Sequence, residues 1–120
     1  MKQRKLEYDR DAPQDARLEL VQRYLHLTQN VMPALAETRS NEWPVRNDHC
    51  FQRIVLDTVC AGIWYDHTLR PAYKHLTLEQ AQRAVLICEN TIAGSADLAD
   101  LNRQSLAWRG KLRAAENRGK

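Results

Sequence analysis

The sequence predicts an all-α protein, a single-domain bundle of four to five helices. Apolar residues recur at spacings of three and four along most of the chain, which is the pattern of a helix with one buried face. No segment alternates apolar and polar residues with the period of a strand. The length of 120 residues, with 43% hydrophobic and 28% charged residues, is typical of one globular domain with its own core.

The two ends of the chain differ from the middle in composition. Residues 1–13 are rich in charge and end at a proline, so we predict a disordered or frayed N-terminal arm. Residues 14–110 form the predicted helical bundle, and residues 111–120 form a basic C-terminal tail. Much of the positive charge lies in these ends, at Lys2, Arg4, Lys5, Arg10, Lys111, Arg113, Arg118 and Lys120.

The first predicted helix covers residues 14–38. Its apolar stripe recurs at helical spacing and consists of Leu18, Val21, Leu25, Thr28, Met32 and Leu35. Pro33 lies inside this pattern, has no amide to donate and clashes with the preceding turn. We therefore expect a kink or break at residues 30–32.

A loop is predicted for residues 39–47, followed by a central second helix from Asp48 to about Tyr65. Trp43 precedes a proline, which favours extended backbone, and a large ring in this loop is expected to pack onto the domain. Either Asn47 or Asp48 is expected to cap the second helix by accepting from its free amides.

The third and fourth helices have clear boundary signals. A capping box at residues 77–80 starts the third helix, and Gly94 ends it. The fourth helix starts at Ser95 or Asp97 and ends at Gly110.

The second predicted helix combines dense apolar residues with charged ones, and desolvated charge is costly unless it is paired or used. At about 100° per residue, one stripe within roughly 20° consists of His49, Leu56, Cys60 and His67. Arg53 and Asp57 flank this stripe and lie one turn apart, so they are expected to pair.

This stripe has two interpretations. In the first it is the wall of an anion-binding pocket, with Arg46 or Arg53 as the clamp and His49 as proton donor or acceptor. In the second, Arg53 and Asp57 form a buried pair that stabilises the fold, and His49 is a hydrogen-bonding residue at the helix start. Free amides at that start favour an anion, whereas the carboxylate of Asp48 competes for them.

The end of the fourth helix is a second polar cluster. Asn102 and Ser105 share the inner face with Leu98 and Trp108, and buried amides and hydroxyls need partners. We expect them to meet the polar stripe of the second helix, with Arg109 reaching the same place.

The function that these clusters predict is the binding of a small anionic ligand in a polar pocket between the second and fourth predicted helices, framed by the 39–47 loop. The predicted anion contacts are Arg46, Arg53 and Arg109, and the predicted acid–base or orienting pair is His49 and Asp57. The predicted apolar walls are Trp43, Trp64 and Tyr65, and the further predicted ligand contacts are Asn47 and Asn102. No motif assigns a reaction or a cofactor, so the sequence does not decide whether the protein is an enzyme.

Two segments, PVRNDHCFQRI (44–54) and LNRQSLAWRGK (101–111), resemble blocks in a group of short bacterial proteins. Some of these carry the label GCN5-related N-acetyltransferase, and the resemblance covers roughly half of the chain. That acetyltransferase fold is mixed α/β and binds coenzyme A on a glycine-rich loop after a strand. This chain has neither feature, so the resemblance implies no residue roles here.

Two other functions agree with the sequence. The basic ends suit a nucleic-acid-binding or regulatory protein whose affinity falls with salt. The apolar stripe of the first helix has heptad-like spacing, which suits an interaction module that forms a homodimer.

The cysteines and apolar runs bear on location. Cys50, Cys60 and Cys88 are an odd number with no close pair, which predicts free thiols in a reducing compartment and hence a cytoplasmic protein. No apolar run has the length of a membrane span, and the first ten residues lack the apolar core of a signal peptide. The histidine and cysteine spacings match no zinc signature, so we expect no metal site.

Overall fold

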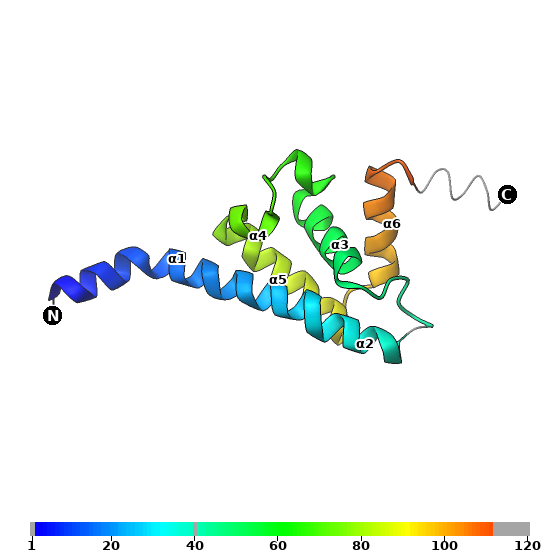
Figure 1. Cartoon of the computed structure of the whole chain (residues 1–120), viewed down its shortest axis with the longest axis horizontal. Helices are drawn as coiled ribbons and strands as arrows, with labels where there is room; N and C mark the ends of the chain where they lie inside the picture. The colour runs from blue at the N-terminus through cyan, green and yellow to red at the C-terminus, as the bar shows by residue number, and fades with distance from the viewer. Residues whose placement is uncertain (1, 40, 112–120) are drawn as a thin grey trace.

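Helix α1 (Lys2–His26) runs along one side of the molecule, and its N-terminal end projects beyond the other helices (Figure 1). A computed structural model describes the backbone of residues 2–39 and 41–111, with side chains from residue 14 onward. Helix α1 starts at Lys2 and not at Gln14, so the segment predicted as an arm continues the backbone of the first helix. Most of the predicted C-terminal tail, residues 112–120, lies outside the described residues.

The predicted break in the first helix is a single π-helical turn. This turn, η1 (Leu27–Val31), separates α1 from α2 (Met32–Thr38). Pro33 has no amide hydrogen to donate to a carbonyl one turn back. The backbone hydrogen bonds just before it therefore change from the α-helical to the π-helical spacing. The amide of Met32 instead bonds the carbonyl of Leu27. The interruption expected just before Pro33 is therefore confirmed.

Helix α3 (Asp48–Cys60) begins after Asn47, whose side-chain oxygen accepts from the amide of Cys50 at 2.9 Å. Before it, Trp43 is buried with its ring edge-to-face against Phe51, at 5.6 Å between ring centroids. The predicted Asn47 cap and the predicted packing of Trp43 are both confirmed.

The end of α3 comes at Cys60, earlier than the predicted end near Tyr65. Ala61 adopts left-handed backbone with a φ of 53° and turns the chain out of the helix. His67 therefore lies beyond α3, and the prediction that it shares a helix face with His49 is wrong.

The segment between α3 and α5 contains two short helical elements where the sequence predicted helix end and loop. These are the 3-10 turn η2 (Trp64–Asp66) and helix α4 (Ala72–His75). Arg17 of α1 fixes this segment by donating to the carbonyls of Leu76 at 2.5 Å and Tyr73 at 3.3 Å. Because a helix this short is not stable by itself, its position depends on such tertiary contacts.

Helices α5 (Leu78–Ala93) and α6 (Leu98–Trp108) agree with the prediction. Thr77 and Gln80 form both hydrogen bonds of the capping box at the start of α5. Asp97 caps α6 by accepting from a backbone amide at 2.9 Å.

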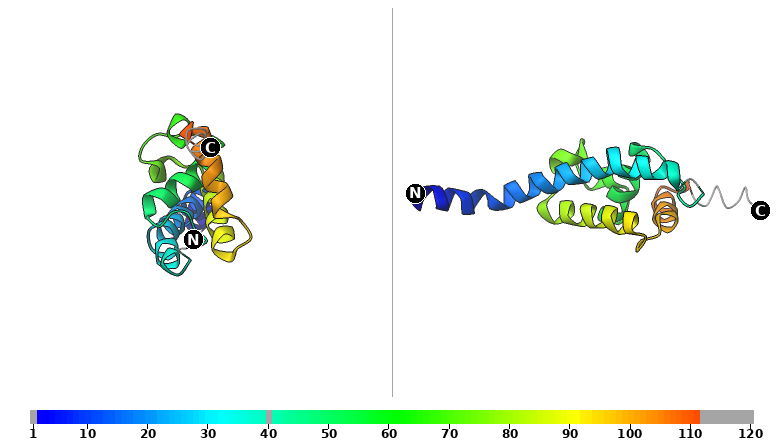
Figure 2. Two further views of the ribbon diagram at one scale, coloured as in Figure 1. Left: turned by 90° about the vertical axis from the view of Figure 1, so that its right-hand side faces the viewer. Right: turned by 90° about the horizontal axis from the view of Figure 1, so that it is seen from below.

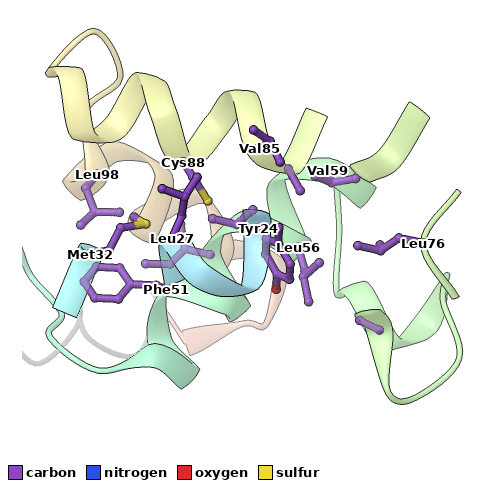
Figure 3. Packing of buried hydrophobic residues seen from close by; sticks show 14 of the residues in the cluster. Tyr24, Leu27, Met32, Phe51, Leu56, Val59, Leu76, Val85, Cys88 and Leu98 are labelled. Carbon is purple, nitrogen blue, oxygen red and sulfur yellow. The ribbon is translucent and has the colours of Figure 1, made fainter. Parts of the chain in front are cut away.

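Helix α3 is the central element of the bundle. It packs against α5, α6 and the π turn η1, while α1 packs along α5 (Figure 1; Figure 2). The core between these helices includes the buried side chains of Tyr24, Met32, Phe51, Cys88 and Leu98 (Figure 3). No strand occurs within the described ranges, and the predicted all-α single-domain bundle is confirmed.

Candidate functional site

The carboxylate of Asp57, on α3, is completely buried and accepts four hydrogen bonds. Two come from Arg109, whose Nε donates to Oδ2 at 2.7 Å and whose Nη2 donates to Oδ1 at 3.0 Å. The hydroxyl of Ser105 donates to Oδ2 at 2.7 Å, and the amide of Trp64 donates to Oδ1 at 3.0 Å. The carboxylate is thus neutralised by one cation and supplied with donors on both oxygens, as a buried charge requires.

Arg109 is the residue at which α6 ends, and its side chain reaches across to α3. Its planar guanidinium fits both oxygens of one carboxylate, which is the strongest common geometry for an ion pair. The hydrogen bond with Asp57 raises the pKa of Arg109, and this effect exceeds the opposing effect of partial burial. The pair is therefore a fixed cross-link between α3 and α6.

Arg53 does not pair with Asp57, although the two lie one turn apart on α3. Its Nη1 donates to Ser105 Oγ at 2.8 Å, and its Nη2 donates to Asn102 Oδ1 at 2.8 Å. The predicted pair is wrong because Arg109 from α6 already occupies both oxygens of Asp57. The expectation that the polar residues of the fourth helix meet those of the second is confirmed.

The charge of Arg53 has no carboxylate partner within the described residues. Arg53 is half-buried, and its two acceptors, Ser105 and Asn102, are neutral. By contrast, the guanidinium of Arg109 is paired with a buried carboxylate. A guanidinium has five N–H groups, so Arg53 keeps donors beyond the two hydrogen bonds that it makes.

A cavity of about 390 Å³ lies beside Arg53, between α1 with η1, α3, and residues 64–73. Its polar lining consists of Gln29, His49, Gln52, Arg53, Arg70 and Tyr73. Its apolar and aromatic lining consists of Tyr24, Leu25, Leu56, Trp64, Pro71 and Ala72. None of these residues is an aspartate or a glutamate, so the fixed charge at the cavity wall is positive.

Arg70 is the second cation of the cavity wall, and aromatic rings hold its side chain. Its guanidinium carbon lies 4.5 Å from the ring centroid of Tyr65 and 5.7 Å from that of Trp64. Arg109 lies over the ring of Tyr65 as well, at 5.3 Å. Stacking of this kind uses the faces of the guanidinium and leaves its N–H edge free for an anion.

The two residues predicted as an acid–base pair do not meet. The side chain of His49 is 89% exposed at the start of α3, and its nearest acidic atom is Oδ1 of Asp48 at 4.0 Å. Asp57 lies about 12 Å further along the helix axis at 1.5 Å per residue. His49 lines the mouth of the cavity, whereas Asp57 belongs to the interface of α3 and α6.

The cavity is not the pocket predicted between the second and fourth helices, because its lining includes no residue of the 39–47 loop, and neither Asn102 nor Arg109. Arg46 is exposed in the loop before α3, and the side-chain oxygen of Asn47 is used by the helix cap. Trp43 packs into the core against Phe51. Tyr65 is 42% exposed and stacks with arginines outside the cavity, while its neighbour Trp64 does line it.

Five polar residues that line the cavity were not predicted as site residues, namely Tyr24, Gln29, Gln52, Arg70 and Tyr73. Gln52 donates to the hydroxyl of Thr28 at 3.1 Å, which ties α3 to the π turn. That turn carries Gln29, and π turns inside helices occur frequently at functional sites. Pro33 was therefore a usable signal for this part of the cavity, since it causes the turn.

Two of the three thiols, Cys60 and Cys88, are disfavoured as thiolates by burial. Burial raises the pKa of Cys88 to about 12, and it also raises the pKa of Cys60. All three cysteines are free. In the part of the chain with described side chains, no three His, Cys, Asp or Glu residues converge in a way that holds a metal ion.

Comparison of the chain with protein-family models, with curated proteins and with solved structures finds no match. The resemblance of the two sequence blocks described above stays a prediction. Among the described residues, no helix combines the length and the apolar character that a membrane span requires.

Proposed function

We propose that the protein binds a small anionic ligand in the cavity between α1, α3 and residues 64–73. The half-buried guanidinium of Arg53 carries this proposal. It lines the cavity, and the oxygens that it contacts on Ser105 and Asn102 are neutral. A charge withdrawn from water without a counter-charge is costly, and an anion bound in the cavity supplies that counter-charge.

The remaining lining supports the same ligand class. Arg70 provides a second cation with a free N–H edge, and His49 stands at the rim. Small-molecule sites are largely apolar cavities with a few placed polar groups, and a volume of about 390 Å³ lies in their usual range.

In this proposal the Asp57–Arg109 pair is a positioning element and does not contact the ligand. Both oxygens of Asp57 already accept hydrogen bonds, and Ser105 connects this carboxylate to Arg53. The proposal concerns binding and assigns no reaction.

A thermal-shift experiment with small anions tests the proposal. Inorganic phosphate, citrate and benzoate are added at millimolar concentration, because a ligand of the folded state raises the melting temperature by mass action. Arg53→Gln removes the charge and keeps a polar side chain, although one too short to reach Ser105 and Asn102 as the Nη atoms of Arg53 do. It is expected to abolish the shift.

Arg46→Gln is the matched control, because it removes one exposed arginine that does not line the cavity. It is expected to keep the shift. The proposal fails if no anion shifts the wild-type protein, or if a folded Arg53→Gln protein shifts as much as wild type.

The two alternative functions remain predictions. The side chains of the basic N-terminal segment and all of residues 112–120 lie outside the described part of the chain. Of the apolar stripe expected to form a homodimer, Val21, Thr28 and Met32 are buried in the core of the chain itself. The three free cysteines support a cytoplasmic location as part of the proposal.

A further inference from the structure

Tyr24 of α1 has a polar atom that the fold does not use. The residue is 2% exposed and belongs to the core cluster (Figure 3). It also lines the cavity. Its hydroxyl makes no hydrogen bond with another described residue. Yet no fully buried side-chain nitrogen or oxygen in the described part of the chain lacks a partner. The hydroxyl is therefore not sealed in the core, and the residue that carries it lines the cavity.

The Tyr24 hydroxyl has no partner within the described part of the protein, so a ligand in the cavity must supply one. Removing a hydroxyl from water without a new hydrogen bond costs free energy, and most buried polar side chains have a partner. A ligand that displaces water from the cavity therefore binds more tightly if one of its own atoms bonds this hydroxyl.

The hydroxyl is a neutral donor under ordinary conditions. Burial raises the pKa of Tyr24 far above its usual value, and the nearby thiol of Cys88 adds to this effect. A neutral phenol donates a hydrogen bond to a carbonyl, hydroxyl or carboxylate oxygen. It therefore recognises an oxygen atom on the ligand and does not repel an anion.

The apolar and aromatic residues of the cavity wall indicate what the non-polar part of the ligand looks like. Leu25 and Leu56 supply aliphatic surface, and Trp64 and Tyr73 supply rings. Aromatic walls favour a flat apolar body through offset or edge-to-face stacking. The lining thus combines two cations that have no carboxylate partner among the described residues, Arg53 and Arg70, with one neutral donor and a surface suited to a ring.

We propose that the ligand is a small aromatic acid that carries a second oxygen. Its acid group meets Arg53, its ring lies against the apolar and aromatic wall, and its second oxygen accepts from the hydroxyl of Tyr24. This inference rests on the proposed function, because it needs Arg53 to bind the acid group. It adds a specificity residue, Tyr24, and a chemical class.

The test compares benzoate with 2-, 3- and 4-hydroxybenzoate by isothermal titration on the full chain. One net hydrogen bond is worth about fivefold in affinity, and about tenfold in the most favourable cases. At least one hydroxybenzoate is therefore expected to bind about fivefold to tenfold more tightly than benzoate. Tyr24→Phe is expected to remove this advantage and to leave the affinity for benzoate unchanged.

Two controls separate ligand recognition from folding. The melting temperature of unliganded Tyr24→Phe should equal or exceed that of wild type, because the lost hydroxyl has no partner in the fold. Tyr65→Phe removes a hydroxyl outside the cavity and should leave every affinity unchanged. A clear drop in the melting temperature of Tyr24→Phe, with no change in affinities, overturns the inference.

The failures of the two proposals are distinguishable. Equal affinity for benzoate and all hydroxybenzoates overturns the role of Tyr24 and leaves the anion site in place. Binding of phosphate or citrate that depends on Arg53, with no aromatic acid bound, overturns the chemical class alone. Absence of binding by every anion overturns both proposals.

Discussion

The guanidinium of Arg109 holds the carboxylate of Asp57 with two hydrogen bonds, at 2.7 and 3.0 Å, across the interface between α3 and α6. The same carboxylate accepts from the amide of Trp64, where the chain turns after α3. One buried charge therefore fixes α3, α6 and the start of the segment that lines the cavity. This arrangement makes the pair important for stability even though it does not contact the proposed ligand.

Removing Arg109 should destabilise the fold strongly. Arg109→Ala leaves the carboxylate of Asp57 buried without a counter-charge, and breaking a buried pair in this way costs about 3 kcal/mol or more. Urea denaturation measures the free energy of unfolding. The control is Arg103→Ala on the same helix, because the ion pair of Arg103 with Asp100 is exposed. It should cost less than about 1 kcal/mol. Equal losses in the two variants would show that Asp57 does not depend on Arg109.

A carboxylate placed beside Arg53 should raise the stability of the fold and lower the affinity for the ligand. Asn102 Oδ1 accepts from Arg53 at 2.8 Å, so Asn102→Asp puts a negative charge in the same place with little change of shape. We expect the free energy of unfolding to rise by about 1 kcal/mol, because the guanidinium gains a counter-charge. The affinity for an anion should fall about tenfold, since the cation is already neutralised.

Gln104→Glu is the control for this charge change. Gln104 is exposed on α6, so the substitution alters the net charge by the same amount without placing it beside Arg53. It should change neither stability nor affinity by a measurable amount. If Asn102→Asp binds the anion as tightly as wild type, Arg53 is not the anion contact.

Stability should fall at alkaline pH because of Cys88. Burial raises the pKa of its thiol from an ordinary value of 9.0 to about 12. Between these pH values the unfolded chain binds fewer protons than the folded one, so the free energy of unfolding decreases as pH rises. The contribution of the protonated thiol is complete below about pH 9 and is lost as the pH approaches 12. The slope is up to about 1.4 kcal/mol per pH unit.

Denaturation of the reduced protein at pH 8 and 10.5 measures this effect. Wild type should lose about 2 kcal/mol more than Cys88→Ala over this interval, because the alanine variant has no thiol to titrate. Val85→Ala, also buried on α5, should lower the free energy by the same amount at both pH values. Identical slopes for wild type and Cys88→Ala would contradict the assignment.

Local signals predicted the helices, whereas contacts between distant segments decided the site. The capping box at residues 77–80 and Pro33 act on neighbouring backbone, so their effects could be read from the sequence. The partner of Asp57 could not be chosen in that way. Both Arg53 and Arg109 carry the right charge, and only the packing of α6 on α3 decides between them.

The cavity could not be predicted from the sequence, for the same reason. Its lining comes from α1, α3 and residues 64–73, which are brought together only by the fold. Tyr24 has helical spacing like the core residues around it, and no pattern distinguishes a core tyrosine from one that lines a cavity. Polar residues expected at the site, such as Asn47, were instead used by helix ends.

The early end of α3 also leads to a prediction about stability. Ala61 has a φ of 53°, a conformation that disfavours residues with a Cβ by about 1 kcal/mol and suits glycine. Ala61 is exposed, so Ala61→Gly removes little packing. We expect it to raise the free energy of unfolding by about 0.5 to 1 kcal/mol, as measured by urea denaturation. Ala93→Gly in the last turn of α5 is the matched control, since the same change in regular helix should lower stability by up to about 1 kcal/mol. A loss of stability in both variants would mean that the left-handed turn at Ala61 does not end α3.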